Sequence, residues 1–309
     1  MHLTRNLAIF AEPVVPLCSP RISMANPLRK TLRRISRVAI TEMHKITPYR
    51  RPHSSLEFVE TNRWDSTHYR RSASFVHELA GAVVDLLNPQ PGESILDLGC
   101  GEGSLSKALQ DAGCRVIGVD GSQSMVDAAK AAGVEAYRMD GQNLTFDSEF
   151  DAVFSNAAMH WMSRDPTAVV QGAKRALRPG GRFVAEFGGH GNLAAITTAL
   201  HAVVQKRGIN AEAVDPWYFP PKEEYRDMLE GEGFSVDMIE SIPRPTLLPI
   251  DLKEFLDICG RGFFQTLPLE SHDKALDEVV ELLRPILQRH DGKWTADYVR
   301  LRFKATLTQ

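Results

Sequence analysis

The sequence is 309 residues long, 43% hydrophobic and 24% charged, and carries a formal net charge of -3 at pH 7. Such a length can bury a full core and suits one large domain with insertions, while its apolar runs fall short of the roughly 20 residues that a membrane-spanning helix needs. The four scattered cysteines, with no C-x-x-C pair, argue against a zinc site or a disulfide framework and for a reducing compartment.

Residues 1–55 are strongly basic, whereas the rest of the chain is acidic. They hold ten Lys and Arg against two acidic residues, Glu12 and Glu42, so this segment carries +8 and the remainder carries -11. The composition predicts either a disordered extension or a transit peptide, for which Met24 is an equally good start. We therefore expect a cytoplasmic protein, or a mitochondrial matrix protein in the second case. An acidic main part argues against a nucleic-acid partner.

From about residue 72, helical and extended patterns alternate along the chain. The predicted strands cover residues 95–98, 115–120, 134–139, 150–155, 182–187, 234–242 and 298–307. The predicted helices cover residues 72–87, 104–112, 124–132, 165–177, 193–206 and 222–230, and a mainly helical stretch covers 252–288. This order predicts a Rossmann-like α/β fold: a seven-stranded, mostly parallel sheet with helices on both faces and a helical lid inserted before the last strand. A turn is expected over residues 178–181.

A glycine-rich turn follows the first predicted strand, at Gly99, Gly101 and Gly103. Glycines let the backbone turn tightly and approach a ligand that a Cβ would block, and a helix N-terminus after the turn suits a nucleotide. Asp120 ends the second strand, 19 residues after Gly101. In nucleotide-binding βαβ units this position faces the ribose hydroxyls. The alternative is that Asp120 only caps the helix that follows.

The residues around the turn favour a cofactor without phosphate. A dinucleotide site has the pattern Gly-x-Gly-x-x-Gly, but Ser104 stands where the third glycine would be. Asp97, just ahead of the glycines, is badly placed beside a pyrophosphate and suits the cationic amino-acid end of S-adenosylmethionine. An NAD-dependent oxidoreductase is the alternative that both residues disfavour.

Further motifs occur at the ends of the predicted strands. They are Trp64 and Tyr69, residues 95–103 (ILDLGCGEG), 118–122 (GVDGS), Asp140, 150–161 (FDAVFSNAAMHW), 177–181 (LRPGG), 186–192 (EFGGHGN) and 297–302 (DYVRLR). Over about residues 60–306 the chain thereby resembles the class I S-adenosylmethionine-dependent methyltransferases, in particular the small-molecule branch of trans-aconitate methyltransferase-like proteins. The resemblance implies a methyltransferase domain over 56–309, with its core over 90–190 and the C-terminal strands and lid over 191–309.

The same resemblance implies a set of cofactor-binding residues. Asp97, with Gly99 and Gly101, would contact the methionine part of S-adenosylmethionine, Asp120 would hold the ribose, and Asp140 would accept from the adenine amine. The other implied residues are Gly121 and Ser122 after Asp120, Met125 on the adenine ring, Gly141 and Gln142 beside Asp140, and Asn156 near the methionine carboxyl group. Asp-Gly is also a common turn, so a structural role is the alternative for Asp140.

His160 is the candidate general base, because it follows the fourth strand by a few residues, where the acceptor should bind. A histidine packed beside Trp161 is the equally weighted alternative. His190, past the fifth strand, is a weaker candidate. Tyr69 is predicted to line the catalytic pocket. The other flanking aromatic residues are expected mainly to pack, and they are Trp64, Phe75, Trp217, Tyr218 and Phe219.

The predicted function is the transfer of a methyl group from S-adenosylmethionine to a small-molecule acceptor, a carboxylate or a hydroxyl, by in-line displacement. Alignment and desolvation can supply most of the rate of such a reaction. A protein or RNA methyltransferase and a non-catalytic cofactor-binding protein are the further alternatives. No Asn-Pro-Pro-Tyr type motif follows the fourth strand, where Ala157 and Ala158 follow Asn156. No metal is expected, and the oligomeric state is left open.

Overall fold

The computed structural model describes residues 80–265 and 267–308, all within one compact unit of the chain. The described strands are β1 (Ser94–Leu98), β2 (Arg115–Asp120), β3 (Glu135–Arg138), β4 (Phe150–Asn156), β5 (Leu177–Gly188), β6 (Phe234–Pro243), β7 (Thr246–Leu247), β8 (Thr295–Ala296) and β9 (Val299–Leu307). The described helices are α4 (Gly81–Leu87), α5 (Ser104–Asp111), α6 (Gln123–Ala131), the 3₁₀ helix η2 (Met159–Trp161), α7 (Pro166–Ala176), α8 (Ala194–Gln205), α9 (Ala211–Val214), α10 (Lys222–Gly231), α11 (Leu252–Cys259), α12 (Arg261–Phe264) and α13 (Leu269–Leu287). The predictions made for residues 1–55 and for the start of the helix over 72–87 lie outside the described residues.

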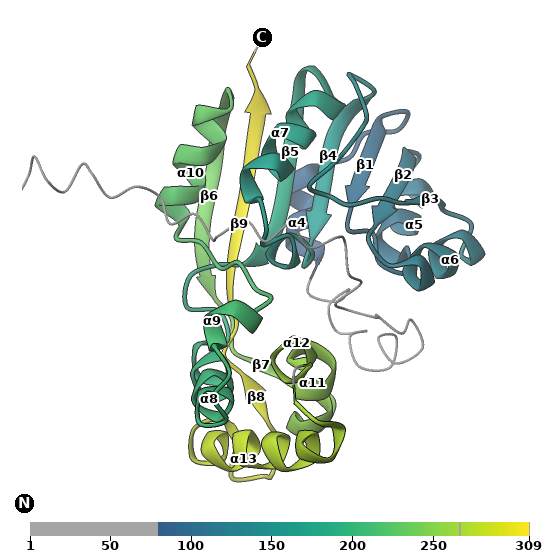
Figure 1. Ribbon diagram of the computed structural model, residues 1–309. Helices are drawn as coiled ribbons and strands as arrows, with labels where there is room; N and C mark the ends of the chain where they lie inside the picture. The colour runs from purple at the N-terminus through teal and green to yellow at the C-terminus, as the bar shows by residue number, and fades with distance from the viewer. Residues whose placement is uncertain (1–79, 266, 309) are drawn as a thin grey trace, which may run out of the picture. The chain divides into compact units, whose positions relative to one another are not determined.

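One seven-stranded sheet has the order β3-β2-β1-β4-β5-β9-β6. The pairs among β1 to β5 are parallel, and β9 runs antiparallel to both β5 and β6. The central strands β1 and β4 are short runs of mainly buried residues, as expected of parallel strands that are covered on both faces. Figure 1 shows these strands running toward the same edge of the sheet. The structure confirms the predicted α/β fold.

Helices cover the sheet on both faces and bury its apolar side chains. On one face, α7 and α10 pack against Phe183, Phe187 and Phe303 of β5 and β9. On the other face, α4 and α5 pack against a separate cluster that includes Phe154 and Val184 of β4 and β5. Because side chains alternate along a strand, neighbouring residues of β5 contribute to different clusters. The carboxyl ends of the parallel strands remain the edge where ligands of such sheets bind.

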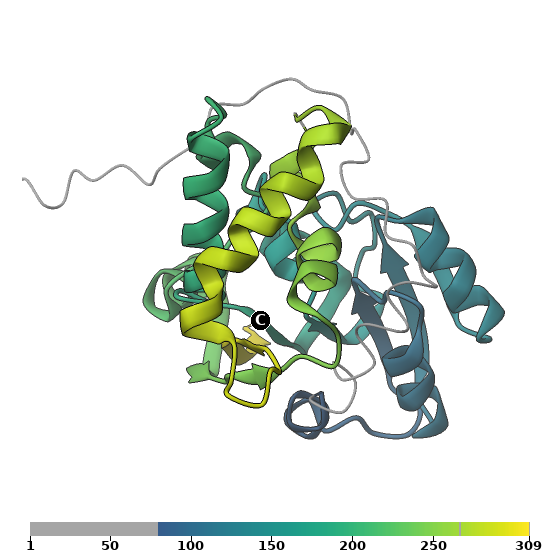
Figure 2. The same ribbon diagram turned by 90° about the horizontal axis from the view of Figure 1, so that it is seen from below.

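A helical subdomain, made of α8, α9, α11, α12 and α13 with the small sheet β7–β8, has a hydrophobic core of its own. In Figure 1 it lies beyond the carboxyl ends of the parallel strands. Figure 2 shows α13 crossing both α8 and α11, which it also contacts. The predicted lid is therefore assembled from two insertions, because α8 and α9 precede β6 whereas α11 to α13 follow it.

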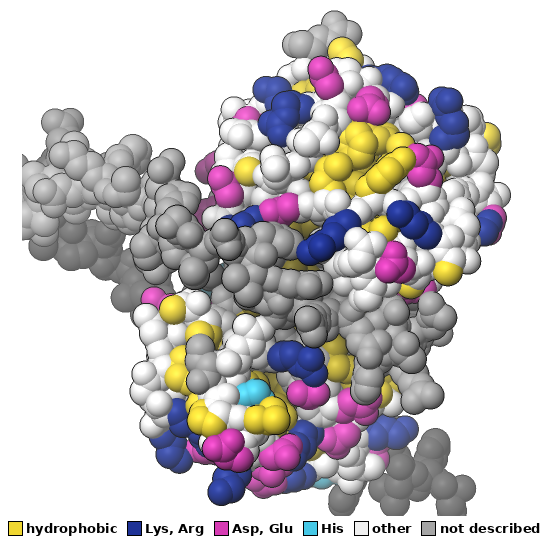
Figure 3. Space-filling view, turned by 45° about the vertical axis from the view of Figure 1, so that its right-hand side comes forward, with side chains coloured by type: hydrophobic (Ala, Val, Ile, Leu, Met, Phe, Trp, Pro, Cys, Tyr) yellow, Lys and Arg dark blue, Asp and Glu magenta, His cyan; other side chains and the backbone are white. Residues whose placement is uncertain are grey.

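The surface of the helical subdomain mixes acidic and basic side chains, as Figure 3 shows for one face. Lys206 and Arg207 of α8 pair with Glu278 of α13, and Lys253 of α11 pairs with Asp277 of α13. These pairs join the helices that the shared core also holds together. Within the described residues, no helix is long and apolar enough to cross a membrane.

The structure differs from the sequence-based prediction at residues 178–181. The sequence predicts a turn there, but these residues lie within β5, which begins at Leu177. Leu177 already pairs with Phe150, and the regular register resumes at Ala152 and Arg182 after an irregularity. Gly180 has a φ of 78°, so the Pro-Gly-Gly sequence forms a bulge in the strand rather than a turn before it. The short elements α9, β7 and β8 are likewise absent from the sequence-based prediction.

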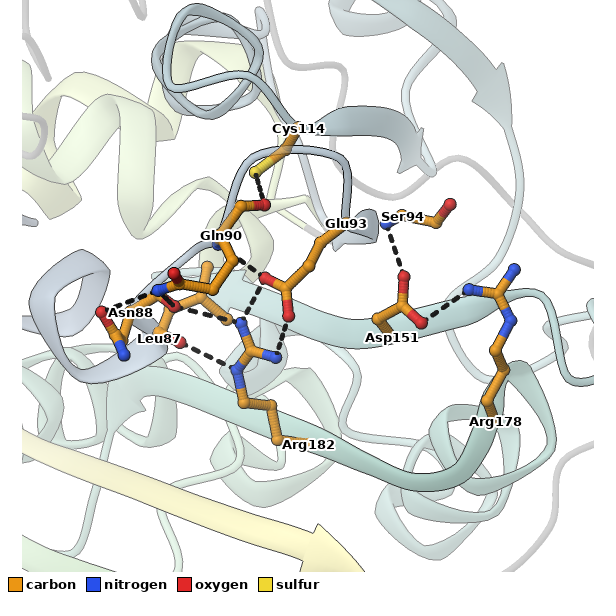
Figure 4. Close-up of polar contacts among 9 residues, drawn as sticks. All are labelled: Leu87, Asn88, Gln90, Glu93, Ser94, Cys114, Asp151, Arg178 and Arg182. Carbon is orange, nitrogen blue, oxygen red and sulfur yellow. Dashed lines mark hydrogen bonds and ion pairs between the residues drawn. The ribbon is translucent and has the colours of Figure 1, made fainter.

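Two ion pairs fasten the opposite end of the sheet, away from the carboxyl ends of the strands (Figure 4). Arg182 of β5 donates two hydrogen bonds of 2.7 Å to the carboxylate of Glu93 and a third of 2.8 Å to the carbonyl of Leu87. Asp151 of β4 accepts from the backbone N–H of Ser94 at 2.8 Å and from Arg178 at 2.6 Å. The pair of Arg182 with Glu93 is bidentate and part-buried, so it holds β5 against the segment before β1. Asp151 joins β4 both to the start of β1 and to Arg178 of β5.

Candidate functional site

The glycine turn after β1 has a left-handed backbone at all three glycines, with φ values of 79° at Gly99, 56° at Gly101 and 89° at Gly103. A Cβ added to Gly99 would lie 2.1 Å from the Cβ of Ala158, and one added to Gly103 would lie 3.1 Å from Ala129. Among the described residues beyond its two chain neighbours, no atom lies within 4 Å of the corresponding position at Gly101. Gly99 and Gly103 therefore serve close packing, whereas Gly101 faces open space where a ligand can approach.

Asp97 lies in β1 just before the turn and is 2% exposed. Its Oδ2 accepts a hydrogen bond of 2.5 Å from the hydroxyl of Ser106, in the helix that begins after the turn. The hydroxyl of Ser155, in β4, donates to the carbonyl of Leu98 at 2.7 Å and so fixes the end of β1 against β4. Sequence reasoning missed both serines, which a glycine-motif pattern does not include.

Asp120 ends β2, as predicted, and its carboxylate is held by two backbone groups. The N–H of Gly101 donates to Oδ2 at 3.0 Å, and the N–H of Ser122 donates to Oδ1 at 2.9 Å. Burial raises the pKa of this carboxyl above its ordinary value, and the two backbone hydrogen bonds oppose that rise. Each oxygen keeps a lone pair for a further donor. Gly121 follows at the same edge, and Ser122 precedes the first turn of α6.

Asp140 lies beyond β3 and forms the centre of a small polar network. Its Oδ1 accepts from the backbone N–H and the Nε2 of Gln142, at 3.0 and 3.1 Å. Its Oδ2 accepts from the guanidinium of Arg164. Arg164 is a neighbour that sequence reasoning missed, because it lies far along the chain, just before α7, and returns to this edge only through the fold.

Met162 lies beside Gly141, and the packing of Met125 on the adenine ring stays a prediction. A Cβ on Gly141 would lie 2.6 Å from the Sδ of Met162, and a Cβ on Gly99 would lie 3.7 Å from its Cε. Met162 therefore touches both the turn after β1 and the turn after β3. Met125 is buried in α6. Met162 directly follows the sequence motif over residues 150–161. No pattern in the sequence indicated that Met162 itself lies at the site.

The chain leaves β4 through a strained turn. Asn156 is the last residue of β4, and Ala157 has a φ of 56°, which costs a non-glycine residue about 1 kcal/mol or more. The N–H of Ala157 donates to the carbonyl of Glu186 at 2.7 Å. This turn places the side chain of Ala158 directly against Gly99. The end of β4 and the glycine turn after β1 are thus packed together as one unit.

His160 lies in η2 and is 7% exposed. Its Nδ1 accepts a hydrogen bond of 3.4 Å from the N–H of Gly188, at the end of β5, and its ring packs 5.3 Å from Trp161 and 5.8 Å from Phe219, centroid to centroid. Burial, and then the positive charge of Arg300, lower the pKa of His160 well below its ordinary value of 6.5. The ring is therefore neutral near pH 7, and with Nδ1 as acceptor its proton resides on Nε2.

A group of charged side chains lies where β5 meets β9, and one of them, Arg300, acts on His160. Glu186, 2% exposed, pairs with Arg244 at 2.7 Å and with Arg302 at 2.6 Å. Arg300 is 5% exposed, pairs in register with Gly188, and its guanidinium lies 4.2 Å from the ring centroid of Tyr298. The alternation of Arg300, Arg302 and Lys304 in the sequence signals one charged face of this strand, but not its closeness to His160.

The aromatic residues that flank the sheet in the sequence, and the second histidine candidate His190, occupy different parts of the structure. Trp217 is buried in the core of the helical subdomain and stacks on Phe219 at 5.6 Å, so both pack as expected. The N–H of Tyr218 donates to the carbonyl of His160 at 2.9 Å, and burial raises the pKa of Tyr218 to about 12. His190 is exposed, and its N–H donates to the carbonyl of Pro220. The aromatic residues Trp64, Tyr69 and Phe75 lie outside the described residues.

The chain has relatives among known proteins. A family described as a methyltransferase domain matches residues 96–185. A protein of Schizosaccharomyces pombe, described as an uncharacterized methyltransferase, is 40% identical over 253 residues, which cover 78% of this chain and 97% of the relative. The malonyl-[acyl-carrier protein] O-methyltransferase of Serratia marcescens is 28% identical over 146 residues, which cover 46% of this chain and 57% of that enzyme.

Solved structures share the fold. The YcgJ protein of Bacillus subtilis is 16% identical, matches with a TM-score of 0.55, and the match covers 75% of this chain and 99% of that one. The phosphoethanolamine N-methyltransferase 2 of Haemonchus contortus, in complex with phosphomonomethylethanolamine and S-adenosylhomocysteine, is 21% identical with a TM-score of 0.52. That match covers 83% of this chain and 61% of the other.

Proposed function

Because the chain belongs to the class I S-adenosylmethionine-dependent methyltransferases, we propose that it methylates an oxygen of a small-molecule acceptor and that this oxygen belongs to a carboxylate. The cofactor supplies, when bound, a methyl group on a sulfonium that an oxygen lone pair can take up directly. The chain's own residues have to bind the cofactor, orient the acceptor and exclude water. The narrower likeness to trans-aconitate methyltransferase-like proteins stays a prediction.

The residues at the edge of the sheet fit this cofactor. The carboxylates of Asp97, Asp120 and Asp140 lie at the ends of β1, β2 and β3, which are neighbours in the sheet. A carboxylate suits the ammonium group of the amino-acid end, and the lone pairs left on Asp120 suit two ribose hydroxyls. A Cβ on Gly101, whose N–H donates to Asp120, would meet no other described atom within 4 Å, which suits the approach of a ligand. We assign Asp97 to the amino-acid end, Asp120 to the ribose and Asp140 to the adenine, where Arg164 and Met162 are further neighbours.

The state of His160 supports a carboxylate as the acceptor. A hydroxyl has to lose its proton during methylation, which favours a general base, whereas a carboxylate already carries the reacting lone pair. The Nδ1 of His160 accepts from Gly188, so the neutral ring offers an N–H donor at Nε2 rather than a basic nitrogen. We infer that His160 orients an acceptor oxygen by donating to it.

Charge at the same place favours an anionic acceptor. After burial, the positive charge of Arg300 is the second cause of the lowered pKa of His160. An anion is drawn to such a site, and a cationic amine is disfavoured there. The O-methyltransferase relative, named for malonyl-[acyl-carrier protein], supports an oxygen acceptor, although this chain spans only 57% of that enzyme.

The test is methyl transfer from labelled S-adenosylmethionine to a panel of small carboxylic acids and matched alcohols, followed by treatment with alkali. A methyl ester is hydrolysed by alkali and releases volatile labelled methanol, whereas a methyl ether is stable. We expect volatile label from the carboxylic acids. Alkali-stable product from an alcohol would contradict a carboxylate acceptor, and label retained only by a protein or an RNA would contradict a small-molecule acceptor.

A further inference from the structure

Ser106 is a fully buried serine in the first turn of α5, and its hydroxyl donates to the carboxylate of Asp97 at 2.5 Å. We propose that Ser106 is a positioning residue that sets the carboxylate of Asp97 for the amino-acid end of S-adenosylmethionine, which rests on the cofactor site proposed above. The hydroxyl does not touch the cofactor in this assignment. It acts only through Asp97.

The geometry gives this hydrogen bond two effects. A donor on Oδ2 fixes the rotation of the carboxyl group, so that Oδ1 keeps one direction. Asp97 is also 2% exposed, and a buried carboxylate depends on donors to remain charged. A hydrogen bond to the charged form favours that form. Without the hydroxyl of Ser106, the carboxylate expected to meet the cofactor's ammonium would lose a donor that fixes its direction.

The hydrogen bond of Ser106 also links the two elements that flank the glycine turn. It belongs to the helix that starts directly after Gly103, whereas Asp97 belongs to the strand that ends directly before Gly99. The hydrogen bond therefore closes the glycine turn across its two ends. Because the turn and the carboxylate are expected to bind the same cofactor, one buried hydroxyl holds both in register.

Ser155 offers a matched control. It is equally buried, and its hydroxyl also donates to β1, at 2.7 Å, but to the backbone carbonyl of Leu98 rather than to a carboxylate. Ser155→Ala removes a hydrogen bond of similar length from the same strand. It leaves the contact between Ser106 and Asp97 in place. A loss of ligand affinity that Ser106→Ala and Ser155→Ala share is then a general effect of weakening the end of β1.

The experiment compares two ligands by isothermal titration calorimetry. S-adenosylhomocysteine and 5′-methylthioadenosine share the adenosine and the sulfur, but only the first has the amino-acid end. We expect Ser106→Ala to weaken S-adenosylhomocysteine about tenfold and to leave 5′-methylthioadenosine within about twofold, since a hydrogen bond to a charged group is lost. Ser106→Thr should restore most of the affinity, and Ser155→Ala should not separate the two ligands.

Equal weakening of both ligands by Ser106→Ala would overturn the proposal, because a merely structural role acts on the whole site. Unchanged binding of both ligands would overturn it as well. Wild-type protein that bound neither ligand would instead refute the cofactor site itself. Thermal unfolding of each variant shows whether it is folded, and Ser106→Cys, whose thiol is a weak donor of similar size, gives the same comparison if the alanine variant does not fold.

Discussion

The imidazole of His160 is constrained by one backbone hydrogen bond and two aromatic rings. Gly188 occupies its Nδ1, and Trp161 and Phe219 pack against the ring. A protonated ring in this position would lose the hydrogen bond from Gly188, because both ring nitrogens would then be donors. The same contacts therefore explain why the ring is neutral and why we assign it the role of a donor.

The neutral state of His160 predicts a pH dependence of stability. Its pKa is lowered in the folded protein relative to 6.5, so the unfolded chain binds the proton more readily. The contribution of the neutral His160 ring to the free energy of unfolding is fully present above about pH 6.5, and it is lost as the pH falls toward the lowered pKa. We expect the Tm of the wild type to fall more between about pH 7.5 and pH 5.5 than that of His160→Asn, whose amide oxygen can still accept from Gly188. Equal slopes in calorimetry would contradict a buried neutral histidine.

Some residues of the site could be predicted because their position follows from the fold alone. Asp97 and Asp120 belong to parallel strands whose carboxyl ends share one edge, so their closeness follows from the strand pattern. Arg164, Met162 and Arg300 could not be found in this way. Each reaches the site through a loop or from an antiparallel strand, and its direction is decided by packing that a local pattern does not contain.

At the scale of elements, the turn after β1 and the turn after β4 depend on each other. Gly99 leaves room for Ala158, and the left-handed backbone of Ala157 carries Ala158 into that room. Gly101, two residues away, has the same handedness but faces open space. The two glycines thus look alike in the sequence motif and differ in what a side chain would meet.

This difference predicts that Gly99→Ala acts mainly on stability and Gly101→Ala mainly on ligand binding. Gly99→Ala places a Cβ 2.1 Å from that of Ala158, so we expect a loss of about 3 kcal/mol in the free energy of unfolding, from overpacking and backbone strain together. A Cβ from Gly101→Ala meets no atom of the part of the chain that the structure describes, so it should cost about 1 kcal/mol, but it should weaken S-adenosylhomocysteine more than tenfold by filling the ligand's space. Denaturant unfolding and calorimetric binding measure the two effects. Equal stability losses would contradict the assignment.

The ion pair between Arg182 and Glu93 joins β5 to the segment before β1 and to the end of α4 (Figure 4). Arg182 lowers the pKa of Glu93 through its hydrogen bond. The stability that this pair adds is therefore present above about pH 4.5 and is lost as the pH falls through the lowered pKa of Glu93.

We expect Arg182→Ala to lower the free energy of unfolding by about 2 kcal/mol at neutral pH, since it removes the charged donor of the carbonyl of Leu87 and of the part-buried carboxylate of Glu93, which would still accept from the N–H of Gln90. Lys107→Ala is the control, because Lys107 pairs with Asp111 on an exposed helix surface. Such exposed pairs contribute about 0.5 kcal/mol or less. Chemical denaturation at neutral pH compares the two variants, and similar losses would show that burial of the Arg182 pair adds nothing.

At the scale of the whole described molecule, the sheet and the helical subdomain have separate hydrophobic cores. Of the subdomain helices, α8 lies within two residues of the predicted helix over 193–206. The mainly helical stretch predicted over 252–288 contains α11, α12 and α13, whereas the sequence did not predict α9 or the division into three helices. That α8 joins α13 could not be predicted, because the two helices are separated by β6 and α10 in the sequence. The shared core and the ion pairs to Glu278 bring them together.

The position of β9 has a consequence for the growing polypeptide. β9 lies between β5 and β6 in the sheet, although α11 to α13 stand between β6 and β9 in the sequence. During translation β6 is therefore made well before its partner, and an unpaired strand edge invites pairing with other nascent chains. The exposed acidic residues Asp237 and Glu240 in β6, and Pro243 at its end, oppose such pairing by charge and by a missing donor. These three residues thus disfavour the pairing of β6 with another nascent chain before β9 is synthesised.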